Sequence, residues 1–596
     1  TGQIRKVVGQ LESFTESNSV LISEATYQLV KGYFECDILG KRKIKGAGTV
    51  PVYTVRRAHA NDRLEAAEIK GELTPLIGRN REVGLIQERW EQASEGMGQV
   101  VLLIGEAGLG KSRLVHVLKE HVKEQSVANC NPIIEWRTSQ NHQHSGLYPA
   151  IECLERMLEF EPQMTPAERL DSLVGHLAEL ALDGDEEIAL LASMMSIPLA
   201  GRYPSLDLQP QQKKDRTFHT LLDWVREMST RQPVLFVVED LHWVDPSTLE
   251  FLELMVQEGQ HDSIMTLLTF RPEFQTPWSS LAHQTSVALN RLTKRQVGEM
   301  IAIRSGISDI PQNLVDHFVE RTDGVPLFVE EFAAMIVDKA GEDGLENFSI
   351  DEIPATLQDL LLARLDRMAS NIEFVQIAAA IGREFRFDVI AAVTGLTDDD
   401  LIAELALLVS SELLNQRGRP PRTRYTFKHA LVQDAAYDSL VRKKRQEVHQ
   451  RIAETLDRQF PDISEPHPEL VAYHFTEANV PEKAIEYWQR ASTRSLERYA
   501  HAEAIGHLTS GLDVLGKMPE SPERDRREIQ MRTSLGVPLQ ATLGYSAPEV
   551  EFNYVRAHEL CGETPEAFPV LYGLFRYFML QAKYPRSIEL GEQLVR

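Results

Sequence analysis

The chain has 596 residues, a formal net charge of −25 and an ordinary share of hydrophobic residues, 43%. This length predicts about three to five domains rather than one core, and the negative charge disfavours nucleic acid as a partner because a phosphate backbone would be repelled. No apolar run approaches the roughly 20 residues that span a bilayer. The four cysteines form no C-x-x-C pair, which indicates a reducing compartment without a zinc site or a disulfide framework.

The first 57 residues are expected to form a small α+β unit, followed by a charged linker at 58–73. Ser23 is placed to N-cap a helix. So short a unit buries too little surface for a secure core of its own, and the chain begins with Thr1 rather than Met. We therefore interpret the chain as a cytoplasmic fragment of a larger protein. The strands predicted in this unit lie at 19–22, 34–39 and 50–55.

A glycine-rich loop follows a predicted buried strand at 99–104 and precedes a predicted helix at 113–122. Glycines let the backbone curl so that successive N–H groups cradle a β-phosphate, and the helix adds the positive end of its dipole. Lys111 is expected to neutralise β- and γ-phosphate oxygens, and the Ser112 hydroxyl to bind Mg²⁺. The predicted ATP-binding loop consists of Gly105, Glu106, Ala107, Gly108, Leu109, Gly110, Lys111 and Ser112.

Two more buried apolar strands are predicted downstream, at 234–238 and 264–269. Apolar strands separated by helices imply a parallel sheet with helices on both faces. Residues 74–290 are therefore predicted to form an α/β P-loop NTPase core. The stretch before the second strand must hold extra helices, one of them at 150–160.

Glu239 and Asp240 follow the strand at 234–238, which places both carboxylates at the sheet edge beside the phosphates. We assign Glu239 to the magnesium ion and Asp240 to the attacking water, with Lys111 as the third catalytic residue. The residues allow the two acidic roles to be reversed. Asp245 is either a member of the same acidic edge or a loop cap.

Two further features can be interpreted either as nucleotide contacts or as ordinary structural turns. Thr269 and Arg271 end the next strand, where a polar side chain can sense the γ-phosphate or form a surface turn. Gly324-Val325-Pro326 forms a rigid turn that can lie against adenine or ribose, or simply join two helices.

The rest of the chain is predicted to be mainly helical. Residues 291–349 form a helical lid, and residues 350–458 contain two short strands, 413–417 and 423–427, about a Gly-Arg-Pro-Pro turn. Two such strands after helices favour a winged helix. Residues 459–596 read as amphipathic helix pairs of irregular spacing, which is typical of a degenerate helical-repeat array.

Taken together, these motifs resemble the signal-transduction ATPases with numerous domains (STAND). They resemble more narrowly the bacterial regulators that join a class III adenylate/guanylate cyclase, an AAA ATPase and TPR repeats. The first 57 residues look like the C-terminal end of the cyclase domain. The other motifs that carry the resemblance are 76–82, the loop at 105–112, 239–246, 323–331, 353–357 and 425–431.

The resemblance implies a nucleotide-controlled switch with slow ATP hydrolysis, in which Arg79, Pro326 and His429 contact the nucleotide. For Arg79 the alternative is a surface charge at a helix start, and for His429 a buried structural histidine. The family's Asn-x-x-x-Arg motif would fall near Lys6 and Gln10, which do not fit, so we expect no cyclic nucleotide synthesis from this chain.

We expect ATP or ADP with Mg²⁺ as ligands, a protein or small-molecule partner on the TPR-like repeats, and no membrane partner. The resemblance leaves room for oligomerisation on activation. Two alternatives stay open: the regulatory portion of an adenylate or guanylate cyclase whose intact parent makes the cyclic nucleotide, and a TPR scaffold in which ATP is structural.

Overall fold

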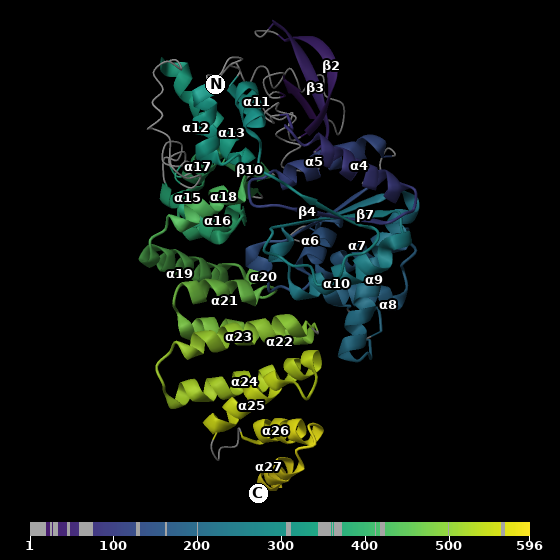
Figure 1. The fold of residues 1–596 in the computed structure, drawn as a ribbon, viewed down its shortest axis with the longest axis vertical. Coiled ribbons are helices and arrows are strands. Elements are labelled where there is room, and N and C mark those ends of the chain that lie inside the picture. The colour runs from purple at the N-terminus through teal and green to yellow at the C-terminus, as the bar shows by residue number, and fades with distance from the viewer. Residues whose placement is uncertain are drawn as a thin grey trace.

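The fold is that of a computed structural model, shown in Figure 1, in which a mixed α/β region carries a long column of helices that ends at the C-terminus. No helix among the described residues is long and apolar enough to cross a membrane. The residues described are 20–23, 27, 34–44, 48–58, 75–126, 132–160, 164–199, 201–204, 206–305, 312–343, 359, 362, 372–411, 413–417, 423–498, 500–561 and 567–595.

The described N-terminal residues include an antiparallel sheet of β1 (Val20–Ser23), β2 (Phe34–Ile44) and β3 (Gly48–Ala58), in the order β1-β3-β2. The three predicted strands are confirmed, although β2 and β3 are longer than expected. β3 continues to Ala58, the first residue of the predicted linker. The rest of that linker, and most of the helix predicted after Ser23, lie outside the described residues; Ser23 itself ends β1.

A five-stranded parallel sheet forms the centre of the α/β region, in the order β5-β6-β7-β4-β8. β4 occupies the predicted residues, while β6 and β7 each extend one residue further. These strands are buried along nearly their whole length, as expected for a parallel sheet covered on both faces. The bounds are β4 (Gln99–Ile104), β5 (Ile133–Arg137), β6 (Val234–Glu239), β7 (Ile264–Phe270) and β8 (Gln284–Ala288).

Helices cover both faces of this sheet, which confirms the predicted layers. On one face α4 (Asn80–Ser94) and α5 (Lys111–Gln125) bury Trp90 and Leu114 against Val101 and Val237. On the other face lies a larger core that includes Trp136 and Phe236, and Figure 1 shows α6, α7, α9 and α10 there. The remaining helices of the α/β region are α6 (Tyr148–Met157), α7 (Pro166–Glu179), α8 (Asp185–Met194), α9 (Pro210–Arg231) and α10 (Pro246–Glu258). Its 3₁₀ turns are η1 (Gln140–His142), η2 (Leu241–Trp243) and η3 (Gly259–His261).

Three helices follow the sheet and pack around Phe318 and Phe332 in a small core of their own. They are α11 (Lys294–Ser305), α12 (Gln312–Thr322) and α13 (Pro326–Asp343).

The next region combines helices with a three-stranded antiparallel sheet in the order β10-β11-β9. The two predicted strands are present, each beginning one residue later than predicted. β9 has only three residues, too few for an alternating pattern to reveal it. The Gly-Arg-Pro-Pro turn lies outside the described residues. The elements are α15 (Ile372–Ile381), β9 (Glu384–Arg386), α16 (Phe387–Thr394), α17 (Asp398–Ser410), β10 (Leu414–Arg417), β11 (Arg424–Phe427), α18 (Ala430–Asp438) and α19 (Arg442–Gln459).

The C-terminal region is a stack of helices whose successive members lie against one another (Figure 1). One apolar core runs through the stack from Val448 on α19 to Leu590. Its helices are α20 (Pro461–Ser464), α21 (Pro468–Glu477), α22 (Pro481–Glu497), α23 (His501–Gly516), α24 (Pro522–Leu543), α25 (Pro548–Cys561), α26 (Ala567–Leu580) and α27 (Tyr584–Val595).

Candidate functional site

The glycine-rich loop joins β4 to α5, as predicted. Gly108 and Gly110 have φ of +82° and +95°, a left-handed backbone that glycine adopts without steric cost. A Cβ on Gly108 would lie 3.0 Å from a side-chain carbon of Val325. The loop therefore needs glycine at position 108 both for its curvature and for the approach of the 324–327 turn.

Lys111 is the first residue of α5, and its ammonium folds back into the loop. Its Nζ donates to the carbonyl oxygens of Gly105 (2.7 Å) and Glu106 (3.1 Å). Burial lowers the pKa of Lys111, while the charges of Asp240 and Glu239 oppose that effect. The loop thus holds a desolvated cation at the place where the predicted phosphate oxygens require one.

Ser112 and Glu239 bring the loop and the end of β6 together. The Ser112 hydroxyl donates to Glu239 Oε2 at 2.7 Å, and burial raises the pKa of Glu239, partly opposed by Lys119. A hydroxyl and a carboxylate beside a phosphate loop fit a hard cation such as Mg²⁺, which usually keeps several waters and phosphate oxygens as its other ligands. In the described part of the chain, no group of three or more His, Cys, Asp or Glu side chains could hold a metal.

Asp240, the residue after Glu239, is held by segments that are distant in the sequence. Its backbone has φ +59° and ψ +44°, and its N–H donates to the hydroxyl of Thr269 (3.0 Å). The Thr138 hydroxyl lies 2.8 and 2.7 Å from the carbonyl oxygens of Glu239 and Asp240 and donates between them. The two neighbouring carboxylates therefore have different partners, although they are adjacent in the chain.

The carboxylate of Asp240 pairs with Arg383, which precedes β9. The distance from the guanidinium to Oδ2 is 3.0 Å. Burial alone raises the pKa of Asp240, but Arg383, His242 and Lys111 outweigh it, so the pKa lies below its ordinary value. Asp240 is therefore a charged but weakened base in this arrangement. Arg383 could not be predicted from the sequence, since it lies 143 residues away from Asp240 and belongs to no recognisable motif.

Thr269 and Arg271 lie at the same edge. Thr269 supports Asp240 by accepting a hydrogen bond from its N–H. Burial lowers the pKa of Lys111 and the charge of Arg271 adds to that effect, whereas burial raises the pKa of Asp434 and Arg271 partly opposes it. Asp434 belongs to α18, so charged groups of the 372–459 region face the ATPase core here. A contact between Arg271 and a γ-phosphate stays a prediction.

Arg79 is buried, which shows that the alternative of a surface charge is wrong. Its guanidinium donates to the carbonyl oxygens of Leu109 (3.4 Å) and Asn290, and to Glu82 (3.3 Å). It therefore ties the start of α4 to the glycine-rich loop and to the end of the sheet. Its predicted contact with adenine is untested by this geometry.

The Gly324–Pro326 turn lies on the glycine-rich loop, because the N–H of Leu327 donates to Gly108 O (3.2 Å). Pro326 begins α13. His429 stands at the N-cap position of α18, on the same helix as Asp434. The nucleotide contacts predicted for Pro326 and His429 stay predictions.

Asp245 is a helix cap, the second of the two alternatives. It N-caps α10 through the N–H of Thr248 (2.8 Å) and also accepts from the N–H of Leu147 (2.9 Å). Of the four cysteines, Cys153 and Cys561 are buried.

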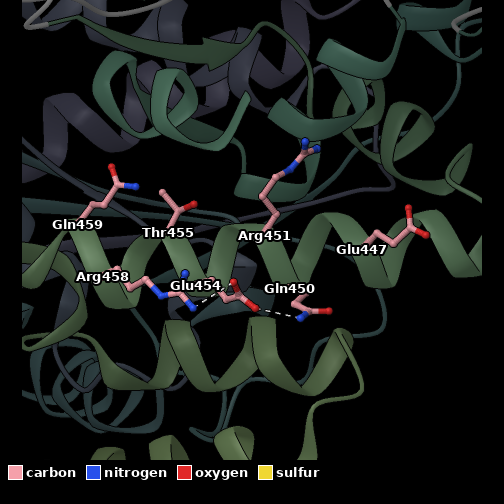
Figure 2. A pocket seen from close by; sticks show the side chains of 7 residues that line it. All are labelled: Glu447, Gln450, Arg451, Glu454, Thr455, Arg458 and Gln459. Carbon is pink, nitrogen blue, oxygen red and sulfur yellow. Dashed lines mark hydrogen bonds and ion pairs between the residues drawn. The ribbon is translucent and has the colours of Figure 1, made fainter. Parts of the chain in front are cut away.

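A hollow on α19 is separate from this site (Figure 2). All the residues that line it belong to that one helix, and Glu454 there accepts from Gln450 (2.9 Å) and pairs with Arg458 (3.5 Å). Its polar groups are partly satisfied by one another along the helix, and it contains no residue of the glycine-rich loop.

With this geometry in place, comparison with known proteins supports the assignment of the core. Residues 75–268 match the model of the AAA ATPase domain family. This region is an AAA-type P-loop ATPase domain. ATP is thus the expected nucleotide, and Mg²⁺ its expected metal.

Several relatives extend beyond that domain. An uncharacterized protein of Rhizobium meliloti (strain 1021) is 26% identical over 589 residues, which are 96% of this chain and 56% of that protein. Adenylate cyclase type 10 of Rattus norvegicus is 21% identical over 272 residues, 43% of this chain and 16% of the cyclase. The chain therefore spans about half the length of the first relative and a smaller part of the second.

Solved structures give distant likenesses. The STAND protein with a tetratricopeptide repeat sensor from Pyrococcus horikoshii aligns with a TM-score of 0.37 and 12% identity, over 88% of this chain and 77% of that one. The Aeropyrum pernix ORC2 protein aligns with a TM-score of 0.30 and 14% identity, over 64% of this chain and 96% of that one.

Proposed function

We propose that this chain is an ATP-binding signal-transduction switch that hydrolyses ATP slowly with Mg²⁺ and couples a ligand or partner on its helical repeats to an output domain. The observation that carries the proposal is the ion pair between Asp240 at the ATPase edge and Arg383 of the following region. A residue suited to activate water is thereby tied to a region outside the ATPase core.

The bound nucleotide would be held by residues that the fold already brings together. Loop N–H groups and Lys111 would hold the phosphates, and Ser112 with Glu239 would hold Mg²⁺, which would neutralise phosphate charge. Arg79, Arg271, Pro326 and His429 are the further nucleotide contacts that we propose. The 324–327 turn supports this, since it already contacts Gly108.

Slow hydrolysis follows from the state of Asp240. A general base works best when its pKa lies near the working pH, whereas Arg383 contributes to holding the pKa of Asp240 below its ordinary value. The pair also occupies the carboxylate that would orient water. Separation of Arg383 from Asp240 would therefore raise turnover, and this separation is the switching step that we propose.

We propose roles for the remaining regions from the arrangement of their helices and strands. We assign α11–α13 to a lid, residues 350–458 to a winged helix and residues 459–596 to TPR-like repeats that bind a protein or small molecule. The helices of 372–459 with their three-stranded antiparallel sheet support the winged helix, and the continuous helical stack supports the repeats. The proposed setting is cytoplasmic, with oligomerisation on activation.

The Lys111→Ala variant tests nucleotide binding. Loss of the buried cation should weaken ATP binding about 10- to 100-fold, as expected when a charge-assisted phosphate contact is removed. Isothermal titration calorimetry with ATP and Mg²⁺ measures this, and small-angle scattering with and without ATP measures compactness. Lys123→Ala, on the same helix and partly exposed, is the control.

Unchanged ATP affinity in Lys111→Ala would refute the proposed site. Loss of binding without any change in the compactness or partner response of the protein would favour the alternative of a TPR scaffold with structural ATP.

A second candidate function is the regulatory portion of an adenylate or guanylate cyclase. The similarity of part of the chain to adenylate cyclase type 10 favours it. Incubation of the protein with ATP or GTP and Mg²⁺ or Mn²⁺, followed by assay of cAMP and cGMP, tests direct synthesis. We expect none, because Lys6 and Gln10 do not match the family motif; detection of either product would overturn that expectation.

A further inference from the structure

The start of α10 is capped by two carboxylates that come from different parts of the chain. Asp245 of the ATPase core accepts from the N–H of Thr248 (2.8 Å), and Glu503 of α23 accepts from the N–H of Ser247 (2.9 Å). A helix normally satisfies its first N–H groups within its own chain segment. Here the helical array supplies one of the caps.

Both carboxylates are withdrawn from water. Each side chain belongs to a residue with 1% of its surface exposed, and Glu503 Oε2 is a buried oxygen without a hydrogen-bond partner in the described structure. Two buried carboxyl groups at one helix turn cannot both ionise at low cost, because like charges repel strongly where water is excluded. An unpaired oxygen is also less costly on a neutral carboxyl than on a carboxylate.

The surrounding contacts keep the two groups together. A Cβ on Gly146 would lie 3.1 Å from Glu503 Oε1 and 3.3 Å from Ala500 Cβ, so the loop before α6 packs closely against α23 and a larger residue at 146 would displace these neighbours slightly. Nearby, Ser145 donates to Glu469 of α21, which also pairs with His467 (3.2 Å). Arg494 of α22 donates to Ser196 (3.3 Å).

The same helix turn is attached to the ATP site. Asp245 lies five positions after Asp240, with only η2 and Val244 between them. Thr138, at the start of the loop that leads to Gly146, holds the carbonyl oxygens of Glu239 and Asp240. A displacement of α23 would therefore pull on both ends of the segment that carries the acidic pair.

We propose that Asp245 and Glu503 share a single proton, and that this carboxyl pair positions the Glu239–Asp240 segment by docking the helical array on the ATPase core. The effect on turnover rests on the proposed ATPase function, whereas the docking itself does not. Glu503 is thus a positioning residue that acts through α10.

The sign of the pH dependence follows from burial. Burial, and then the charge of Glu503, raise the pKa of Asp245 from 3.8 to about 7, and burial raises the pKa of Glu503 as well. A raised acid pKa means that the docked state binds the proton more tightly than the undocked one. Docking is then fully present below about pH 4, weakens about tenfold per pH unit as the pH rises, and stops weakening above about pH 7.

The other charged groups at this interface do not account for a change in docking between about pH 4 and pH 7. Lys214 of α9 faces Glu503 and is ion-paired with Glu250 of α10 (2.5 Å). Burial lowers the pKa of the His507 imidazole to about 4. Burial also lowers the pKa values of His144 and His501 below their ordinary value. Glu469, a further buried carboxylate at this interface, is ion-paired with His467.

Hydrogen exchange of the intact chain without nucleotide tests the docking. The protection factors of peptides that cover α10 and residues 140–148 should fall about tenfold between pH 6 and pH 8. Glu503→Gln keeps the cap but loses the charge that raises the pKa of Asp245 beyond the effect of burial, so its protection should fall less than that of the parent between pH 6 and pH 8. Glu503→Ala should show low protection at both pH values. Glu253→Gln, which changes a less buried carboxylate of α10, is the control and should follow the parent.

Identical pH profiles for the parent and Glu503→Gln would overturn the shared proton. Circular dichroism establishes that the variants fold. For positioning, Glu503→Ala should change kcat for ATP while the ATP affinity measured by calorimetry stays constant; a change in affinity alone would overturn the positioning role. If the parent binds no ATP, the proposed function fails, and the exchange result still decides the docking.

Discussion

Glu239 and Asp240 are adjacent residues with separate environments. Glu239 accepts the Ser112 hydroxyl at 2.7 Å, while Asp240 pairs with Arg383 at 3.0 Å. Adjacent side chains along a strand point to opposite faces, so the two carboxylates at the end of β6 meet different partners. The geometry favours the assignment of Glu239 to the metal and Asp240 to water, although the sequence allowed the reverse.

Substitution of each acid separates these roles. Glu239→Gln should weaken Mg²⁺-dependent ATP binding, because a carboxylate ligand becomes an amide. Asp240→Asn should leave the affinity for ATP nearly unchanged and lower kcat about 100-fold or more, the usual contribution of a general base. Calorimetry with and without Mg²⁺ and steady-state assays measure both.

Asp223→Asn, a more exposed carboxylate on α9, is the control for these substitutions. The assignment is wrong if Asp240→Asn abolishes the magnesium dependence while Glu239→Gln preserves it.

Among the elements, the turn that begins α13 connects the helices α11–α13 to the glycine-rich loop. Gly324 has φ +68°, and a Cβ there would lie 2.4 Å from the carbonyl oxygen of Leu292. Two backbone hydrogen bonds fix the turn, from Leu292 N–H to Gly324 O (2.8 Å) and from Leu327 N–H to Gly108 O (3.2 Å). The contact is made by backbone atoms, so it depends on shape more than on side-chain chemistry.

Gly324→Ala should therefore destabilise the protein by about 2 kcal/mol or more, since alanine pays for the left-handed backbone and also collides with a fixed carbonyl. Thermal unfolding followed by circular dichroism measures the loss, and ATP affinity should fall with it. Gly175→Ala is a matched control, because α7 leaves open space around that position and alanine favours a helix. Equal melting temperatures for the two variants would contradict the argument.

At the scale of the whole molecule, two distant regions converge on one short segment. Arg383, just before β9, holds Asp240, and Glu503 of the C-terminal helical stack holds the start of α10. Both contacts are polar and few in number, so their loss changes charge and position without dismantling an apolar core. A switch needs such a contact, because a ligand shifts an equilibrium only by its different affinity for the two states.

Arg383→Ala should raise the ATP turnover of the intact chain severalfold, because the pKa of Asp240 moves back toward its ordinary value and its carboxylate is released. Turnover at saturating ATP and the radius of gyration measure the effect. Arg442→Ala, at an exposed position at the start of α19, is the control. A lower turnover in Arg383→Ala would show that this arginine assists catalysis instead of restraining it.

The sequence by itself determined the nucleotide loop, the acidic pair and the three main strands of the parallel sheet. Each of these features depends on a few consecutive residues. Glycines permit the left-handed backbone of the loop, and apolar runs form strands that are buried on both faces. Tertiary structure alone decided the strand order, the short strand β9, the burial of Arg79 and the pairing of Asp240 with Arg383. It also settled Asp245 as a cap and brought Glu503 beside it. These features depend on residues tens to hundreds of positions apart, whose meeting is fixed by packing and leaves no local pattern in the chain.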